Sequence, residues 1–413
     1  MREPAIHFEG KTNIPPLKKN HLVFRLIGGN IISFFGDQIY MIALPLTVLA
    51  VSGSAMSMGI VAALERVPVL LQPLTGILSD RLNRKWLLIG CDIGRAILIG
   101  FIALMFITNQ LMIWHVFCCA FIIGLLSQIY NTSQFATIPH LARKEDLPTI
   151  NAINTGSFNS VTMIAPGLGG IIISLMNPGF ALLINSISFI LAALTVISIP
   201  YTYEISIRKE LQQKSIKEDL IEGFRFVIKT KPILITNIAQ LFSIFGLTLF
   251  LTILVFHLKD TIHLSAKEIG LLLSVGGGAA VLGAISSSYL KEKYTYQKIL
   301  FYSSFVGGLS IVFFGFIDTL ISLIILNAVG TFAASIKNPC IITIRQRVTP
   351  DHLLGRVQAT SRFMTWGFVP IAAFLSGLFS AYFGTAVTII IGGMIATIAA
   401  FLFIHPALDG IND

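Results

Sequence analysis

Long runs of apolar residues recur along most of this chain. They span eighteen or more residues, the length a helix needs to cross the apolar core of a bilayer, about 30 Å thick. Charged residues make up only 12% of the 413, which excludes an ordinary water-soluble enzyme. We therefore expect an all-α integral membrane protein of about twelve spans. They are placed at 26–50, 56–78, 86–108, 111–135, 150–176, 180–200, 232–257, 267–290, 297–317, 320–343, 356–382 and 385–405.

The basic residues between these spans are unevenly distributed. The net charge is +9, and nearly all of the 29 lysines and arginines fall on one face of the expected bundle; the other face has only Lys259 and Lys267. The positive-inside rule makes the basic face cytoplasmic, so we expect a multi-pass protein of the cell's inner (cytoplasmic) membrane with both termini inside. This distribution argues against nucleic acid as a partner. Residues 2–20 are polar and do not resemble a cleavable signal peptide.

A polar segment divides the chain into two halves. We expect a cytoplasmic tail at residues 1–21, a six-helix bundle at 22–200, a linker at 201–231 and a second six-helix bundle at 232–413. Apolar residues recur at helical spacing within the linker, which predicts an amphipathic helix lying along the cytoplasmic interface between the halves. Residues match between the halves at an offset of 207, as Asn131 does with Asn338, which indicates duplication of one unit.

A short charged loop follows the second span. Residues 76–85 read GILSDRLNRK and resemble the loop signature of the major facilitator superfamily, G-x-L-x-D-R-x-G-R-K. Asn83 replaces the usual glycine, and asparagine also adopts left-handed turns readily. The resemblance implies two pseudo-symmetric six-helix bundles with the substrate site between them. It also implies that Asp80 meets the N-terminal end of helix 11 and closes a cytoplasmic gate in the outward-facing state.

The third span contains two further candidates for the cytoplasmic gate. Asp92 and Arg95 lie three residues apart there, close to the cytoplasmic side, and either join the same latch or form only a local ion pair. The residues assigned to the gate are Gly76, Asp80, Arg81, Arg84, Asp92 and Arg95.

Ionisable residues in the first two spans are candidates for proton coupling. Asp37 shares a helix face with two polar residues, and this face must point into a cavity or the bundle interior because polar groups are costly in lipid. Arg66, in the next, antiparallel span, lies at the depth of Asp37. Either Asp37 or Glu65 carries a proton that Arg66 tunes, or Asp37 and Arg66 form a fixed ion pair that would hold the carboxylate ionised. The set assigned to proton coupling and the cavity is Asn30, Ser33, Asp37, Gln38, Glu65 and Arg66.

Three further sequence features bear on packing, on the membrane interface and on a substrate cavity. The fifth span contains a Pro-Gly-x-Gly-Gly sequence that resembles the helix 5 motif of superfamily antiporters, although a proline-kinked helix with small packing residues explains it equally well. The residues of this glycine motif are Pro166, Gly167, Gly169 and Gly170.

Lys337 is placed near the inner end of its span, from which its side chain can reach the membrane interface. The aromatic residues expected to line a substrate cavity are Phe34, Tyr130, Phe363 and Trp366.

Several segments resemble one bacterial exporter branch of the superfamily, which includes macrolide efflux proteins and enterobactin exporters. They are residues 33–38, 139–147 and 362–367 and the Asp92-x-x-Arg95 pair. The resemblance implies a secondary active transporter that exports bulky amphipathic compounds such as drugs, macrolides or siderophores by proton-coupled alternating access. A lysophospholipid carrier or a metal-ion exporter of the same fold is the alternative. A membrane enzyme or scaffold is disfavoured, because no convergent catalytic set is visible.

The expected partners follow from the same sequence. They are the lipid bilayer and a small-molecule substrate, with no nucleic acid and no nucleotide, because no phosphate-binding glycine loop is present. The four cysteines show no metal-ligand spacing, so we expect no metal site, and we expect no cofactor. Energy would then come from a proton or other ion gradient. The protein is expected to be a monomer.

Overall fold

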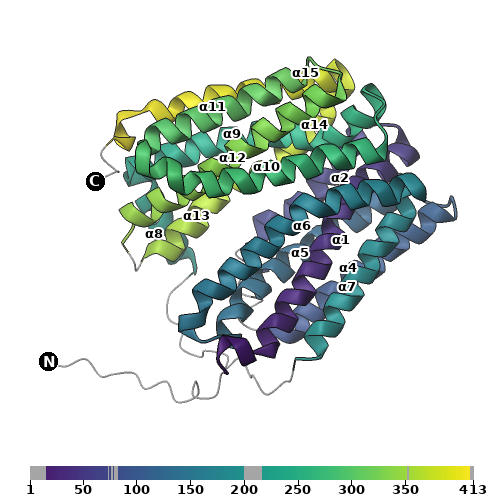
Figure 1. The fold of residues 1–413 in the computed structure, drawn as a ribbon, viewed down its shortest axis with the longest axis horizontal. Coiled ribbons are helices and arrows are strands. Elements are labelled where there is room, and N and C mark those ends of the chain that lie inside the picture. Colours follow the sequence, from purple (N-terminus) through teal and green to yellow (C-terminus); the bar gives the residue numbers. More distant parts are fainter. Residues whose placement is uncertain are drawn as a thin grey trace.

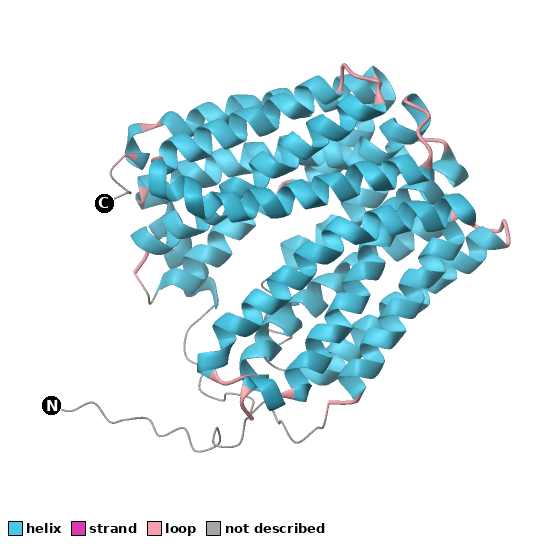
Figure 2. Cartoon of the chain, viewed as in Figure 1, coloured by secondary structure: helices cyan, strands magenta, loops and turns pink. Residues whose placement is uncertain are grey.

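The computed structural model describes residues 15–72, 74–75, 78, 82–199, 216–350 and 353–409. In these ranges every regular element is a helix, as the sequence predicted, and eleven helices are long and apolar enough to cross a membrane (Figure 2). We call the end of the molecule at which the first long helix begins the terminal side, and the other end the opposite side. Successive membrane spans alternate in direction between these two sides (Figure 1).

Six spans form the first half of the chain (Figure 1). They are α1 (His21–Ser52), α2 (Ala55–Arg66) with the 3-10 turn η2 (Val67–Leu71), α4 (Arg84–Ile107), α5 (Ile113–Leu141), α6 (Leu147–Leu175) and α7 (Pro178–Ile197). Their core consists of close contacts of α7 with α1 and α4, of α5 with α2 and α4, and of α1 with α6. Two short 3-10 turns, η1 (Leu17–Lys19) and η3 (Lys144–Asp146), lie on the terminal side.

The second half repeats this arrangement. Its helices are α8 (Ile216–Lys229), α9 (Lys231–Phe256), α10 (Ala266–Lys293), α11 (Tyr296–Phe314), α12 (Leu320–Val348), α13 (Leu354–Trp366), α14 (Val369–Phe383) and α15 (Thr385–Ala400). A π-helical turn, η5 (His257–Thr261), ends α9, and the 3-10 turns η7 (Phe401–Ile404) and η8 (Pro406–Leu408) follow α15. Buried Asn30 in α1 and buried Asn237 in α9 stand 207 residues apart, the predicted offset.

Two spans that the sequence predicted as continuous are interrupted by proline. The α-helix of the second span ends at Arg66, because Pro68 has no N–H to donate and its ring crowds the preceding turn. The eleventh span is divided at Gly367 and Phe368 into α13 and α14, since Pro370 cannot donate to the carbonyl group four residues earlier. The eleventh span is confirmed at Leu354–Phe383, with this interruption inside it.

Asn83 starts α4 in a way that the sequence did not predict. Its backbone is extended (φ −67°, ψ 111°) rather than left-handed, and its side chain accepts a hydrogen bond from the backbone N–H of Lys85 at 3.0 Å. Asparagine is a favoured N-cap because its side chain satisfies one of the orphan N–H groups of the first turn. The Lys85 ammonium in turn donates to the carbonyl groups of Ile197 and Ile199 at the end of α7.

The two halves meet on the opposite side through helix pairs with glycine at the contact. An ideal Cβ on Gly59 of α2 would lie 2.6 Å from the Cα of Gly377 in α14, and one on Gly270 of α10 would lie 3.0 Å from the Cα of Gly170 in α6. Only residues without a side chain allow backbones to come this close. From these contacts the bundles diverge, and their terminal-side ends stand apart (Figure 1).

The linker helix α8 lies on the terminal side and packs against α13 and α9. Val227 is fully buried with Val357, Gly223 abuts the backbone of Arg356, and Glu222 forms an ion pair with Arg356. The expectation that this helix lies between the halves is corrected, because its main contacts are with α13 and α9 of the second half. These contacts cover Val227, whereas Ile221 and Phe224 remain 48% and 41% exposed.

Candidate functional site

Within the described part of the chain, the side chain of Glu65 has one hydrogen-bond partner, and this partner is neutral. The carboxylate lies in the last turn of α2, about 15 Å from the start of that helix at 1.5 Å per residue. It accepts a hydrogen bond of 2.5 Å from the hydroxyl group of Tyr40 in α1, and both side chains are partly buried. Gly124 of α5 fits against the Glu65 backbone, where a Cβ would collide with it. The acid is therefore held between three helices.

Arg66 does not pair with Asp37, which corrects one of the two readings of these residues. Neighbouring residues on a helix point about 100° apart, so Glu65 and Arg66 cannot both face α1. Glu65 takes the inner position, and Arg66 is exposed. Asp37 instead lies near the middle of α1, partly buried, beside Asn185 and within electrostatic reach of Arg95.

Asp92 and Arg95 form an ion pair inside the first bundle. A terminal nitrogen of Arg95 lies 2.6 Å from Oδ1 of Asp92, and the two side chains are 4% and 0% exposed. Asp92 lies about 12 Å and Arg95 about 17 Å from the start of α4. Both residues lie deeper than the sequence predicted, because α4 begins at Arg84, two residues before the predicted span. The pair is local and enclosed, which favours the second of the two predicted readings, a local ion pair.

Aromatic rings complete the surroundings of Arg95. Its guanidinium carbon lies 4.4 Å from the ring centroid of Tyr130 and 4.0 Å from that of Phe189, distances at which cation–π attraction is effective. The Tyr130 hydroxyl donates to Oδ1 of Asn30 at 2.6 Å. Tyr130 is only 4% exposed, so its assignment to a substrate cavity is also corrected: the helical phase of α5 turns it into the bundle.

The polar stripe on α1 points into the bundle interior, one of the two predicted directions. Asn30, Ser33 and Gln38 are 2%, 4% and 8% exposed. The Ser33 hydroxyl donates to the carbonyl group of Asn30 within its own helix. Among the described residues, Oδ2 of Asp92 and Nδ2 of Asn30 are buried with no hydrogen-bond partner. This interior therefore retains unused polar atoms close to Asp37.

The glycine motif of α6 lies at the contact between the halves. The backbone N–H of Gly167 donates to the Ser274 hydroxyl of α10 at 2.7 Å, and Gly169 lies against Ile39 of α1. Pro166 presents its carbonyl group to Gly270. A helix-packing role accounts for these contacts.

The remaining assigned residues are scattered. Phe34 packs edge-on against Phe158 of α6, with ring centroids 4.5 Å apart. Phe363 and Trp366 lie on α13 and are 46% and 40% exposed. Among the gate residues, Arg84 is the first residue of α4 and is 9% exposed. Gly76, Asp80 and Arg81 lie outside the described residues.

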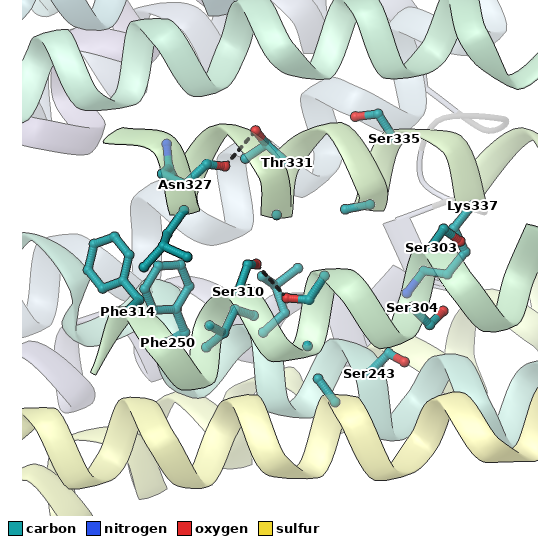
Figure 3. Close-up of a pocket in the computed structure, with 18 of the residues that line it drawn as sticks. Ser243, Phe250, Ser303, Ser304, Ser310, Phe314, Asn327, Thr331, Ser335 and Lys337 are labelled. Carbon is teal, nitrogen blue, oxygen red and sulfur yellow. Dashed lines mark hydrogen bonds between the residues drawn. The ribbon is translucent and has the colours of Figure 1, made fainter. Parts of the chain in front are cut away.

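The second half contains a cavity that the sequence did not predict (Figure 3). It has a volume of about 230 Å³ and lies among α9, α10, α11, α12 and α15. Lys337 lines it, about 17 Å from the end of α12, because that helix continues five residues past the predicted span. At this depth the side chain points into the cavity rather than to the interface, which corrects its predicted position. The only sequence signal was a lysine within an apolar run.

Helices of membrane-spanning length in two bundles, with ionisable groups enclosed at mid-depth, define the class of multi-pass membrane proteins. The sequence model of the Major Facilitator Superfamily matches residues 26–373 and 236–409. The chain belongs to this superfamily, as the loop signature predicted.

The relatives and solved structures agree with this assignment. The enterobactin exporter EntS of Citrobacter koseri is 25% identical over 371 residues, covering 88% of this chain and 86% of the relative. The multidrug efflux pump Tap of Mycolicibacterium fortuitum is 23% identical over 352 residues, covering 83% and 85%. Crystal structures of the nucleoside transporter NupG and of an inward-facing bacterial homologue of ferroportin share the fold, with TM-scores of 0.72 and 0.71. They are 17% and 16% identical, and cover 92% and 93% of this chain and 98% of their own.

Proposed function

We propose that this transporter is a proton-coupled exporter of bulky amphipathic compounds such as drugs, macrolides or siderophores. The exporters among its relatives support the direction of transport. The observation that carries proton coupling is that Asp37 forms no ion pair with Arg66 and lies beside the neutral Asn185 side chain, with Arg95 acting on it only through space. A fixed arginine partner would hold the carboxylate ionised, whereas an acid with only neutral direct partners can take up and release a proton. Glu65, bonded to the Tyr40 hydroxyl, meets the same condition.

The terminal side is the cytoplasmic side in this proposal. The positive-inside rule supports it, since the basic residues at the helix ends gather there. Contact on the opposite side and separation on the terminal side then correspond to an inward-facing state of a monomer in the inner membrane. Closing the cytoplasmic side would bring the loop that contains Asp80 to the start of α13, where a carboxylate is favoured by about 0.3–1 kcal/mol. This energy biases a gate without locking it.

The proposal is tested by uptake into inside-out membrane vesicles from an efflux-deficient host. Such vesicles acidify their interior when energised, and an exporter then accumulates its substrate inside. We expect a macrolide, a cationic dye or a siderophore to accumulate in a way that collapses with the pH gradient. Either Asp37→Asn or Glu65→Gln should lower that accumulation about tenfold or more, because an amide cannot carry the proton.

The control is Asp260→Asn, which changes an exposed acid on the opposite side and should leave uptake unchanged. Accumulation that survives both gradient collapse and the two interior substitutions would disprove proton coupling. The same vesicles are offered Mn²⁺ and a lysophospholipid. Accumulation of either one in place of the drugs would assign the transporter to the alternative class of metal or lipid carrier.

A further inference from the structure

The cavity of the second half has two chemically different ends (Figure 3). Phe250 and Phe314 enclose one end, with ring centroids 5.1 Å apart in an edge-to-face arrangement. Ser243, Ser304 and Lys337 gather at the other end (Figure 3). A space of about 230 Å³ is smaller than pockets for drug-sized ligands, which measure about 300–1,000 Å³. It has the size of a compact ligand or of one end of a larger one.

Lys337 has no counterion within the described part of the chain. No carboxylate lies within ion-pair distance of its ammonium group there, and no hydrogen bond engages it. The contrast with the first half is direct, since Arg95 has Asp92 and two aromatic rings. An unpaired charge at this depth costs about 2.5–3.5 kcal/mol on insertion scales. The charge is therefore available for an incoming anion.

Two serine hydroxyl groups at the same end are also unused. Ser243 and Ser304 are each 5% exposed, and neither Oγ atom has a hydrogen-bond partner among the residues that the structure describes. A buried hydroxyl without a partner costs about 1–3 kcal/mol. These hydroxyl groups and the three N–H groups of Lys337 are all hydrogen-bond donors at one end of the cavity. Among the described residues, they have no acceptor there.

We propose that this cavity is a binding site for an organic anion. A carboxylate or a similar acidic group would bind Lys337, Ser243 and Ser304, and an attached aromatic body would pack against Phe250 and Phe314. The site lies entirely within the second half and is distinct from Asp37 and Glu65. The inference goes beyond the proposed export, and it is measured as binding, so its failure and that of proton-coupled export are separate results.

The test compares two ligands of the same shape. Naphthoate and its uncharged amide, naphthamide, are bound by equilibrium dialysis to the purified full-length protein in detergent micelles. We expect naphthoate to bind at least about tenfold more tightly, the value of one charged hydrogen bond. Lys337→Met should remove this preference, Lys337→Arg should retain it, and Ser304→Ala should weaken naphthoate binding several-fold.

The control is Lys267→Met, which removes an exposed positive charge on the opposite side and should leave naphthoate binding unchanged. Each variant is first required to elute as a single species and to unfold at a temperature near that of the wild type. Equal affinity of the wild-type protein for naphthoate and naphthamide would overturn the proposal, whatever the fate of the variants. Unchanged naphthoate preference in a folded Lys337→Met protein would overturn it as well.

Discussion

Replacing Arg95 by methionine is expected to lower the free energy of unfolding by about 3–5 kcal/mol. The substitution leaves the Asp92 carboxylate, which is 0% exposed, without its partner at 2.6 Å. The aromatic rings of Tyr130 and Phe189 would then face a shorter, uncharged side chain. The measurement is reversible unfolding of the purified protein in mixed micelles, followed by helical circular dichroism.

Two further variants separate the ion pair from a general effect of mutation. Arg225→Met changes an exposed arginine of α8 and should alter stability by no more than about 0.5 kcal/mol. Combining Arg95→Met with Asp92→Leu should recover most of the lost stability, since apolar residues of similar volume often replace a buried ion pair without penalty. A loss of less than about 1 kcal/mol in the single variant Arg95→Met would contradict the structural importance of the pair.

Replacing Gly59 by leucine is expected to abolish the state in which the opposite side is closed. A Cβ at this position would lie 2.6 Å from the Cα of Gly377 and 2.9 Å from the carbonyl oxygen of Ala373. These are backbone atoms of α14 and cannot rotate away, so α2 and α14 must separate. Transport by alternating access requires this contact to form in every cycle, so substrate accumulation in vesicles should fall to background.

Spin labels on the two helices measure the separation directly. With one label at Ser57 and another at Tyr382, the distance distribution should shift to longer values in the leucine variant. Gly90→Leu is the matched control, because Gly90 is exposed in α4 with nothing within 4 Å of an added Cβ, and it should leave the distances unchanged. An unaltered distance in Gly59→Leu would refute the view that this glycine contact closes the opposite side.

The sequence predicted the helices well because hydropathy and length are properties of each segment alone. It predicted partners poorly because these depend on rotation about the helix axis. The sequence alone does not determine whether Glu65 or the adjacent Arg66 faces Asp37. The packing of α2 against α1 and α5 turns Glu65 inward. The Asn30 to Tyr130 hydrogen bond joins residues 100 positions apart, and no local pattern encodes it.

Errors in helix ends also changed the interpretation of single residues. Placing the end of the tenth span at residue 343 put Lys337 near the interface, whereas α12 continues to Val348 and leaves this lysine at mid-depth. Pro68 and Pro370 were visible in the sequence, but proline also occurs inside continuous helices, as Pro166 does in α6. Whether a proline interrupts a helix depends on whether its neighbours satisfy the freed carbonyl groups.

The glycine contacts lie near one end of long helices, so a small rotation at these contacts produces a large displacement at the other end of each helix. Gly270 and Gly277 of α10 touch α6 within the first twelve residues of that helix, and sixteen residues, about 24 Å, extend beyond them to Lys293. A rotation of about 10° about this fulcrum moves the far end of α10 by about 4 Å over an arm of that length. A movement of the terminal-side helix ends that is large enough to admit or exclude a substrate therefore requires only a small displacement at the glycine contacts on the opposite side.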